Sequence, residues 1–284
     1  MKESKAWIRE KNILAKNAST IAFEDMDFLR SEACRGIRLE LEYWKPEVAM
    51  ILQRVESTLV IFGSARTPSP EKAQAQLRKA KKALAAAPKN AEAKAALKRA
   101  EAAVRDSHYY QVAREFGALV TRESQRIDKT DKTFVVLTGG GGGIMEAGNR
   151  GAHDAGGLTA SLNITLPFEQ KANPYITPDL SFQLHYFSIR KMHFLKRARA
   201  VASFPGGFGT MDELFEVLTL IQTKKIPRMP ILLFGKEFWE GLIHWQQFVD
   251  RRMITPDDLS LFSYCETAEE GWKKICDFYG IDKD

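Results

Sequence analysis

The sequence is poor in cysteine and histidine and has no long apolar run. Its 284 residues include three cysteines, Cys34, Cys265 and Cys276, which are too few and too scattered for a disulfide framework or a cysteine-based zinc site. The histidines stand apart, without the spacing of a metal site. No apolar run approaches the roughly 18 residues of a membrane span, and the N-terminal stretch has no apolar core of the signal-peptide type. We therefore expect a soluble, cytoplasmic protein that binds neither a metal ion nor a membrane.

Positive charge is concentrated in one segment of an otherwise ordinary globular composition. The chain has a formal net charge of +6, yet residues 71–105 contain ten basic and only three acidic residues, so the remainder is close to neutral. The basic character of the whole chain is therefore poor evidence for nucleic-acid binding, and we expect no nucleic-acid partner.

The basic segment has the pattern of two short helices. Ser69-Pro70 is a helix-start signal, with serine at the N-cap and proline at the first helical position. Alanine and leucine then recur on one helical face until Pro88-Lys89-Asn90, where Asn90 can cap a second helix. We predict an inserted helical hairpin at about 69–105. It is either a solvated insertion or a basic prong that binds a partner.

Short apolar runs alternate with helical segments in the rest of the chain. Strands are expected at 59–62, 134–137, 158–164, 200–204 and 230–234, with possible strands at 184–187 and 260–264. Such alternation is typical of βαβ units and a parallel sheet. Residues 1–56 form a helical N-terminal segment in this interpretation, and residues 57–284 form one domain.

Three loops leave the carboxyl ends of the expected strands, where ligands bind in such sheets. They are Gly63 to Arg66, Gly139 to Gly143, and Pro205 to Thr210. A glycine loop that leads into a helix offers free N–H groups and the positive end of the helix dipole, which favours phosphate; the alternative is a plain turn. Neither glycine-rich loop has the spacing of a dinucleotide fingerprint, and the chain has no Gly-Lys-Ser/Thr, so the usual NAD and nucleoside-triphosphate sites are disfavoured.

Charged residues near two helix starts suggest a ligand site. Ser188 is expected to cap a helix that begins Ile189-Arg190-Lys191. Two cations in a first helical turn are unfavourable beside the positive end of the helix dipole, so their presence suggests an anionic ligand nearby. The alternative is a helix end that is simply solvated. Glu213 follows Thr210 at the spacing of a capping box, so it either caps its helix or faces the ligand. In the functional interpretation, both helix starts converge on one sugar phosphate.

Combined motifs then point to a family. Residues 205–213 read PGGFGTMDE, residues 138–147 read TGGGGGIMEA, and Gly63-Ser64-Ala65-Arg66 follows the first strand. Residues 162–164, with Leu166-Pro167 and Glu169-Gln170, add features of a longer bacterial branch. Over residues 59–67 and 133–234 the chain resembles the LOG ("Lonely guy") family of cytokinin riboside 5′-monophosphate phosphoribohydrolases, long labelled "possible lysine decarboxylases".

The resemblance implies a fold, a reaction and a set of site residues. The fold would be α/β, a Rossmann-like doubly wound parallel sheet, here with the inserted α-helical hairpin and N-terminal helices. The protein would be a homodimer or a higher homo-oligomer, with its active site at or near the dimer interface. It would hydrolyse the N-glycosidic bond of AMP or a cytokinin riboside monophosphate without a cofactor; the alternative is a non-catalytic nucleotide or nucleotide-cofactor carrier. Arg190 and Glu213 would be the catalytic pair. The substrate-binding residues would be Lys191, Gly206, Gly207, Phe208, Gly209, Thr210, Met211, Asp212 and Thr219, with Gly63, Ser64, Gly139, Gly140 and Gly141.

Overall fold

A computed structural model describes residues 18–127, 133–165 and 171–281. Its centre is a seven-stranded sheet in the order β4-β3-β2-β1-β5-β6-β7, in which every neighbouring pair is parallel. The chain builds outward from β1 in one direction, returns to β5 beside β1, and then builds in the other direction, which is a doubly wound sheet. The predicted fold class is confirmed. The strands are β1 Thr58–Phe62, β2 Val135–Thr138, β3 Thr159–Ile164, β4 Ser181–Leu184, β5 Ala198–Ser203, β6 Ile231–Phe234 and β7 Ser263–Cys265.

Helices cover both faces of the sheet, so the central strands are buried on both sides. In β1, Val60 and Phe62 face a core closed by α8, α9 and α10, whereas Leu59 and Ile61 face a core closed by α6, α7 and α12. These helices are α6 His108–Ile127, α7 Ile144–Asp154, α8 Phe187–Lys196, α9 Phe208–Gln222, α10 Lys236–Leu242 and α12 Ala268–Tyr279, with the short α11 Trp245–Asp250 between the last two. In the parts of the chain that the structure covers, none of the helices combines the length and apolarity that crossing a bilayer requires.

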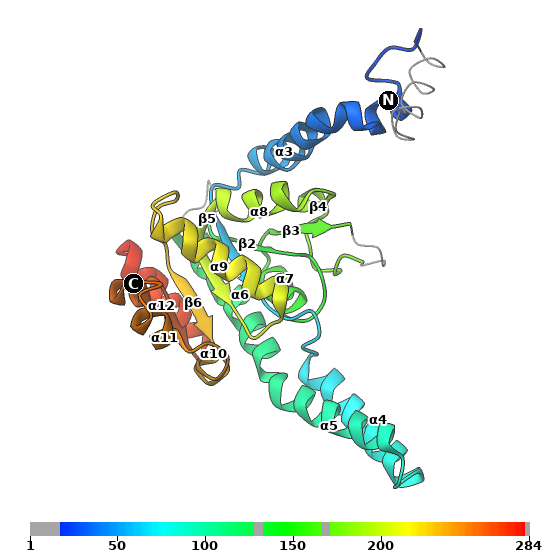
Figure 1. Ribbon diagram of the computed structural model, residues 1–284, viewed down its shortest axis with the longest axis vertical. Coiled ribbons are helices and arrows are strands. Elements are labelled where there is room, and N and C mark those ends of the chain that lie inside the picture. Colours follow the sequence, from blue (N-terminus) through cyan, green and yellow to red (C-terminus); the bar gives the residue numbers. More distant parts are fainter. Residues whose placement is uncertain (1–17, 128–132, 166–170, 282–284) are drawn as a thin grey trace.

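Two helical additions project from opposite ends of the molecule (Figure 1). At one end lie α2 Met26–Arg30, the 3₁₀ turn Glu32–Cys34 and the long α3 Arg35–Leu52. At the other end is the predicted hairpin, formed by α4 Pro70–Ala86 and α5 Ala91–Asp106.

Both start signals of the hairpin act as expected. The Ser69 Oγ accepts the Lys72 N–H at 3.4 Å, and the Asn90 Oδ1 accepts the Ala93 N–H at 3.0 Å. Small side chains such as Ala80 are buried between the two helices, which leaves the basic side chains outside.

Two strand positions differ from the expected ones. The fourth strand was expected at 184–187, but Leu184 is its last residue and pairs with Ile164. The chain turns there because the Glu42 carboxylate, from α3, binds the next two backbone N–H groups and starts α8. The last strand lies at 263–265, because residues 256–261 form a 3₁₀ helix with its own capping box. Residues 166, 167, 169 and 170, which contribute to the resemblance, lie outside the described residues.

Candidate active site

A cleft opens at the carboxyl edge of the sheet, where β1 and β5 lie side by side and the strand order reverses. Its volume is about 910 Å³, which is sufficient for a nucleotide. The lining residues come from the loops after β1, β2 and β5, from the first turns of α9, and from α7, α8 and the end of α10. This is the position at which doubly wound sheets bind ligands.

The cleft gathers most of the predicted site residues, including both members of the predicted catalytic pair. Those on its lining are Gly63, Ser64, Gly139, Arg190, Gly206, Gly207, Phe208, Gly209, Thr210, Met211, Asp212 and Glu213. Gly140, Gly141, Lys191 and Thr219 are not among the lining residues. The exposed Thr219 hydroxyl donates to its own helix, at Phe215 O.

The amino end of α9 is open to an anion. Gly207 is the N-cap and has no side chain with which to cap the helix, so the first amides, those of Phe208 and Gly209, have neither a helical partner nor a side-chain cap from this residue. Gly206 allows close packing here, because a Cβ atom on it would lie 2.2 Å from the Thr210 Oγ1. Backbone N–H groups and the helix dipole favour phosphate at this point.

Glu213 is not a helix cap. Since α9 begins at Phe208, Thr210 lies inside the first turn, and the capping-box interpretation of Glu213 is wrong. The Glu213 side chain lies one turn further, is only 8% exposed, and lines the cleft. Burial raises the pKa of Glu213 to about 7, against the opposing effect of Lys191 and Arg190. A carboxyl group with such a pKa can take up or release a proton near neutral pH.

Arg190 lies against the carboxyl ends of β2 and β3. Its Nε donates to Leu162 O at 2.8 Å, and its guanidinium stacks over Phe194 at 5.0 Å. Gly139 makes room for it, because a Cβ atom there would lie 2.7 Å from the Arg190 Nη2. Burial lowers the pKa of Arg190, although Glu213 and Asp212 oppose the change. Among the residues described, no carboxylate lies within ion-pair distance of Arg190, so its remaining donors are available to an anionic ligand.

Lys191 joins α8 to α9 beneath the cleft. Its Nζ lies 3.0 Å from Asp212 Oδ2, 3.6 Å from Glu213 Oε2 and 2.8 Å from Glu216 Oε2. Burial alone would lower the pKa of Lys191, but the hydrogen bonds to Glu216 and Asp212 outweigh it and raise the pKa. The ammonium is thus bound by carboxylates of the protein itself. It influences the cleft by favouring the ionised form of Glu213, which lowers the pKa of that carboxyl group.

The Glu42 carboxylate binds the two backbone N–H groups that directly precede α8. Glu42 Oε1 accepts the His185 N–H at 2.8 Å, and Oε2 accepts the Tyr186 N–H at 3.0 Å. One sequence prediction is therefore wrong, because Tyr186 rather than Ser188 is the N-cap of α8. The two amides that Glu42 binds precede the first turn of the helix, and Phe187 and Arg190 of that turn line the cleft.

The second glycine loop is turned partly away from the cleft. Asn173 Nδ2 donates to Gly140 O at 3.3 Å and to Gly141 O at 3.1 Å, while the Gly140 N–H donates to Thr138 Oγ1 at 2.9 Å. Gly140 has a φ of +77°, which glycine adopts without strain. The sequence indicated a phosphate loop here, but only Gly139 of its five glycines lines the cleft.

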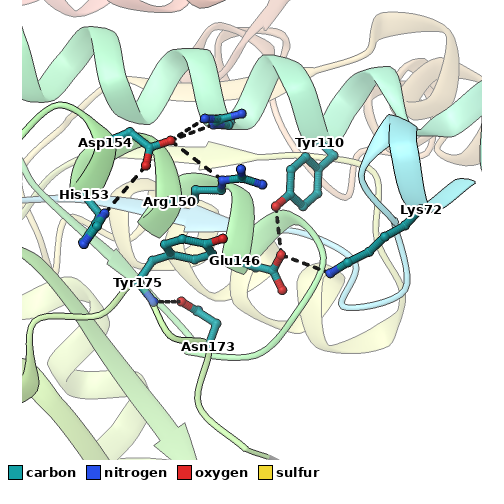
Figure 2. A network of polar contacts seen from close by, with 9 residues as sticks. Lys72, Tyr110, Glu146, Arg150, His153, Asp154, Asn173 and Tyr175 are labelled. Carbon is teal, nitrogen blue, oxygen red and sulfur yellow. Dashed lines mark hydrogen bonds and ion pairs between the residues drawn. The ribbon is translucent and has the colours of Figure 1, made fainter.

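A polar network outside the cleft holds this loop and the hairpin in place (Figure 2). Glu146, in the first turn of α7, accepts the Tyr110 hydroxyl at 2.9 Å and pairs with Lys72 of the hairpin at 3.5 Å. On the same helix, Arg150 lies over the Tyr175 ring, and the Tyr175 N–H donates to Asn173 at 3.2 Å. The network therefore connects the base of the hairpin to the residue that holds Gly140 and Gly141.

Sequence reasoning predicted Phe208 and Met211 but missed the other large apolar side chains of the lining. Met145, Phe187, Phe215, Leu242 and Ile243 contribute to the cleft. Their sequence context resembles that of core residues, so no local signal distinguishes them. Nor do the residues described include a group of His, Cys, Asp and Glu side chains that could hold a metal ion.

Comparison with known proteins agrees with the motifs. Residues 145–275, which contain Arg190 and Glu213, match the family described as "Possible lysine decarboxylase". This part of the chain is therefore similar to that family. The resemblance that the motifs indicate is thereby confirmed.

The individual proteins to which the chain is similar share little sequence identity with it. An uncharacterized protein from Archaeoglobus fulgidus is 26% identical to it over 138 residues, which are 48% of this chain and 81% of that protein. The molybdenum cofactor binding protein from Rippkaea orientalis is 20% identical, with a TM-score of 0.42 over 60% of this chain and 88% of that one. The molybdenum cofactor carrier protein of Chlamydomonas reinhardtii is 18% identical, with a TM-score of 0.43 over 61% and 89%.

Proposed function

We propose that the protein hydrolyses the N-glycosidic bond of a nucleoside 5′-monophosphate and releases the free base and ribose 5-phosphate. The observation that carries the proposal is Glu213, a buried carboxyl with a pKa of about 7 in the same cleft as Arg190 and the open amino end of α9. The similarity of residues 145–275 to the family supports the same conclusion.

The phosphate would bind at the amino end of α9. The free amides of Phe208 and Gly209 and the helix dipole attract it there, and Arg190 adds a charged, planar donor. With the phosphate held, the ribose would extend toward Glu213, one helical turn further along α9.

Glu213 would act on the bond that breaks. As the carboxylate it takes a proton from a water molecule, whose oxygen forms a bond to the ribose C1′. The C1′–N bond breaks, its electron pair leaves with the base, and the base takes up the proton that Glu213 removed from the water. The carboxylate also stabilises the positive charge that develops on the ribose in an oxocarbenium-like transition state. Arg190 would orient the phosphate or the departing base.

The cleft is poorly suited to lysine decarboxylation. Among the described residues that line it there is no lysine to form a Schiff base with an aldehyde cofactor. The ammonium of the nearby Lys191 is held by three carboxylates, which keeps it protonated and unable to act as a nucleophile.

A panel of nucleoside 5′-monophosphates, with chromatographic detection of the free base, tests the proposal. We expect release of the base from AMP or from an N⁶-substituted AMP, and no release from the corresponding nucleoside, which lacks the phosphate. If the nucleotides bind in calorimetry but no base appears, the protein is instead a nucleotide-binding or carrier protein on the same fold.

A further inference from the structure

The outward face of α3 carries a stripe of exposed apolar side chains. Its members are Ile37, Leu41, Trp44, Val48 and Ile51, each between 49% and 59% exposed. They follow one another at intervals of four, three, four and three residues. This 3.5-residue repeat is the pattern of a two-helix seam, in which apolar residues at alternating spacings meet those of a second helix.

The opposite face of α3 is firmly attached to the body of the protein. Glu47 is buried and pairs with Arg197 at 2.5 Å and with Lys196 at 2.7 Å, and Met50 is buried in the core. Glu42, on the same side, caps α8. The body therefore keeps α3 helical before any partner binds. Association would not lose free energy to the ordering of this helix.

We propose that the stripe is a docking surface for the same stripe of a second copy of this chain, with the two α3 helices parallel. A two-fold axis between the helices would place each stripe residue against its own copy, which is how an isologous interface forms. The stripe lies outside residues 59–67 and 133–234, so the family resemblance does not imply this interface. It is also independent of the proposed function.

Charges beside the stripe favour the parallel arrangement. Glu40 and Lys45 flank the seam at the positions called g and e and are exposed, and neither forms an ion pair with another described residue. In a parallel pair, a residue at g faces the residue five positions later in the partner, so Glu40 of one copy faces Lys45 of the other, twice by symmetry. In an antiparallel pair, equivalent flanks meet, and like charges approach each other.

The molar mass of the full-length protein tests the interface. By light scattering or sedimentation at micromolar concentration, we expect the double variant Leu41→Lys/Val48→Lys to have half the molar mass of the wild type. Met253→Lys is the matched control, because Met253 is a 70% exposed apolar residue outside the stripe, and this variant should keep the wild-type mass. Circular dichroism verifies that all three proteins are folded. A monomeric wild type, or a double variant with the wild-type mass, would overturn the proposal.

Cysteine cross-linking tests the orientation by a second route. The native Cys34, Cys265 and Cys276 are buried, so the wild type provides a low background. Under mild oxidation, the single variant Ile37→Cys should form a disulfide-linked dimer, because a parallel pair brings the two substituted positions together. If cross-linking occurs only when Ile37→Cys is combined with Ile51→Cys, the helices are antiparallel and the proposed arrangement is wrong.

Discussion

Replacing Glu213 by glutamine should make the protein more stable at alkaline pH. Burial raises the pKa of Glu213 to about 7 in the folded state, from an ordinary value of 4.5. A group whose pKa is raised by folding contributes most to stability below its unfolded pKa, and this contribution is lost as the pH rises through the folded value. Ionised Glu213 therefore weakens the fold above pH 7. Glutamine has nearly the same shape but no charge, so it avoids this cost.

The size of the effect follows from the two pKa values. At pH 8 the difference between about 7 and 4.5 corresponds to roughly 3 kcal/mol, whereas at pH 5 most of the folded protein already has a protonated Glu213 and the cost is about 1 kcal/mol. We therefore expect Glu213→Gln to increase the free energy of unfolding by up to about 3 kcal/mol at pH 8. Its advantage should shrink by about 2 kcal/mol at pH 5.

Urea unfolding at pH 5, 6.5 and 8 measures this dependence. Glu216→Gln is the matched control, because Glu216 also binds Lys191, at 2.8 Å, but its side chain is 30% exposed and does not line the cleft. Replacing the carboxylate by an amide removes the charge of this ion pair and should lower the free energy of unfolding, by up to about 1 kcal/mol. The reasoning is refuted if Glu213→Gln is less stable than the wild type at pH 8, or if its advantage does not change with pH.

Three other substitutions test separate parts of the site. Arg190→Lys keeps the charge but loses the planar donor set, and we expect kcat/KM for a nucleoside monophosphate to fall by about 10- to 100-fold, measured by steady-state release of base. Gly139→Ala places a methyl group 2.7 Å from the Arg190 Nη2; it should reduce kcat/KM similarly, and wild-type activity would contradict the packing argument. Glu42→Gln weakens the cap of α8, so thermal denaturation should show a loss of about 0.5–2 kcal/mol, and an unchanged midpoint would contradict the cap.

Local signals in the sequence were sufficient for the hairpin and for most of the sheet. Ser69 and Asn90 cap the two helices as predicted, because an N-cap depends on residues two or three positions away. The buried strands also have a local signature, since both of their faces are apolar. The cleft could be predicted because its glycine loops follow those strands directly.

Contacts between distant segments explain the errors. Glu42 caps a helix 143 residues away, and Asn173 holds Gly140 from 33 residues away, so neither contact has a sequence signal. The capping-box spacing at Glu213 misled for another reason. Gly207 is the N-cap of α9, three residues before Thr210, so the buried Glu213 lies inside the helix, in its second turn. Its position in the cleft depends on how α9 packs against α8.

Release of free base by the wild type and by Glu213→Gln is the most direct test of the account. With a substrate identified from the panel, we predict that the activity of the wild type rises through about pH 7 as Glu213 loses its proton. Glu213→Gln should bind the nucleotide, as measured by calorimetry, and release base at least about 100-fold more slowly. A variant that releases base as fast as the wild type would contradict the assignment of Glu213 as the group that acts on the glycosidic bond.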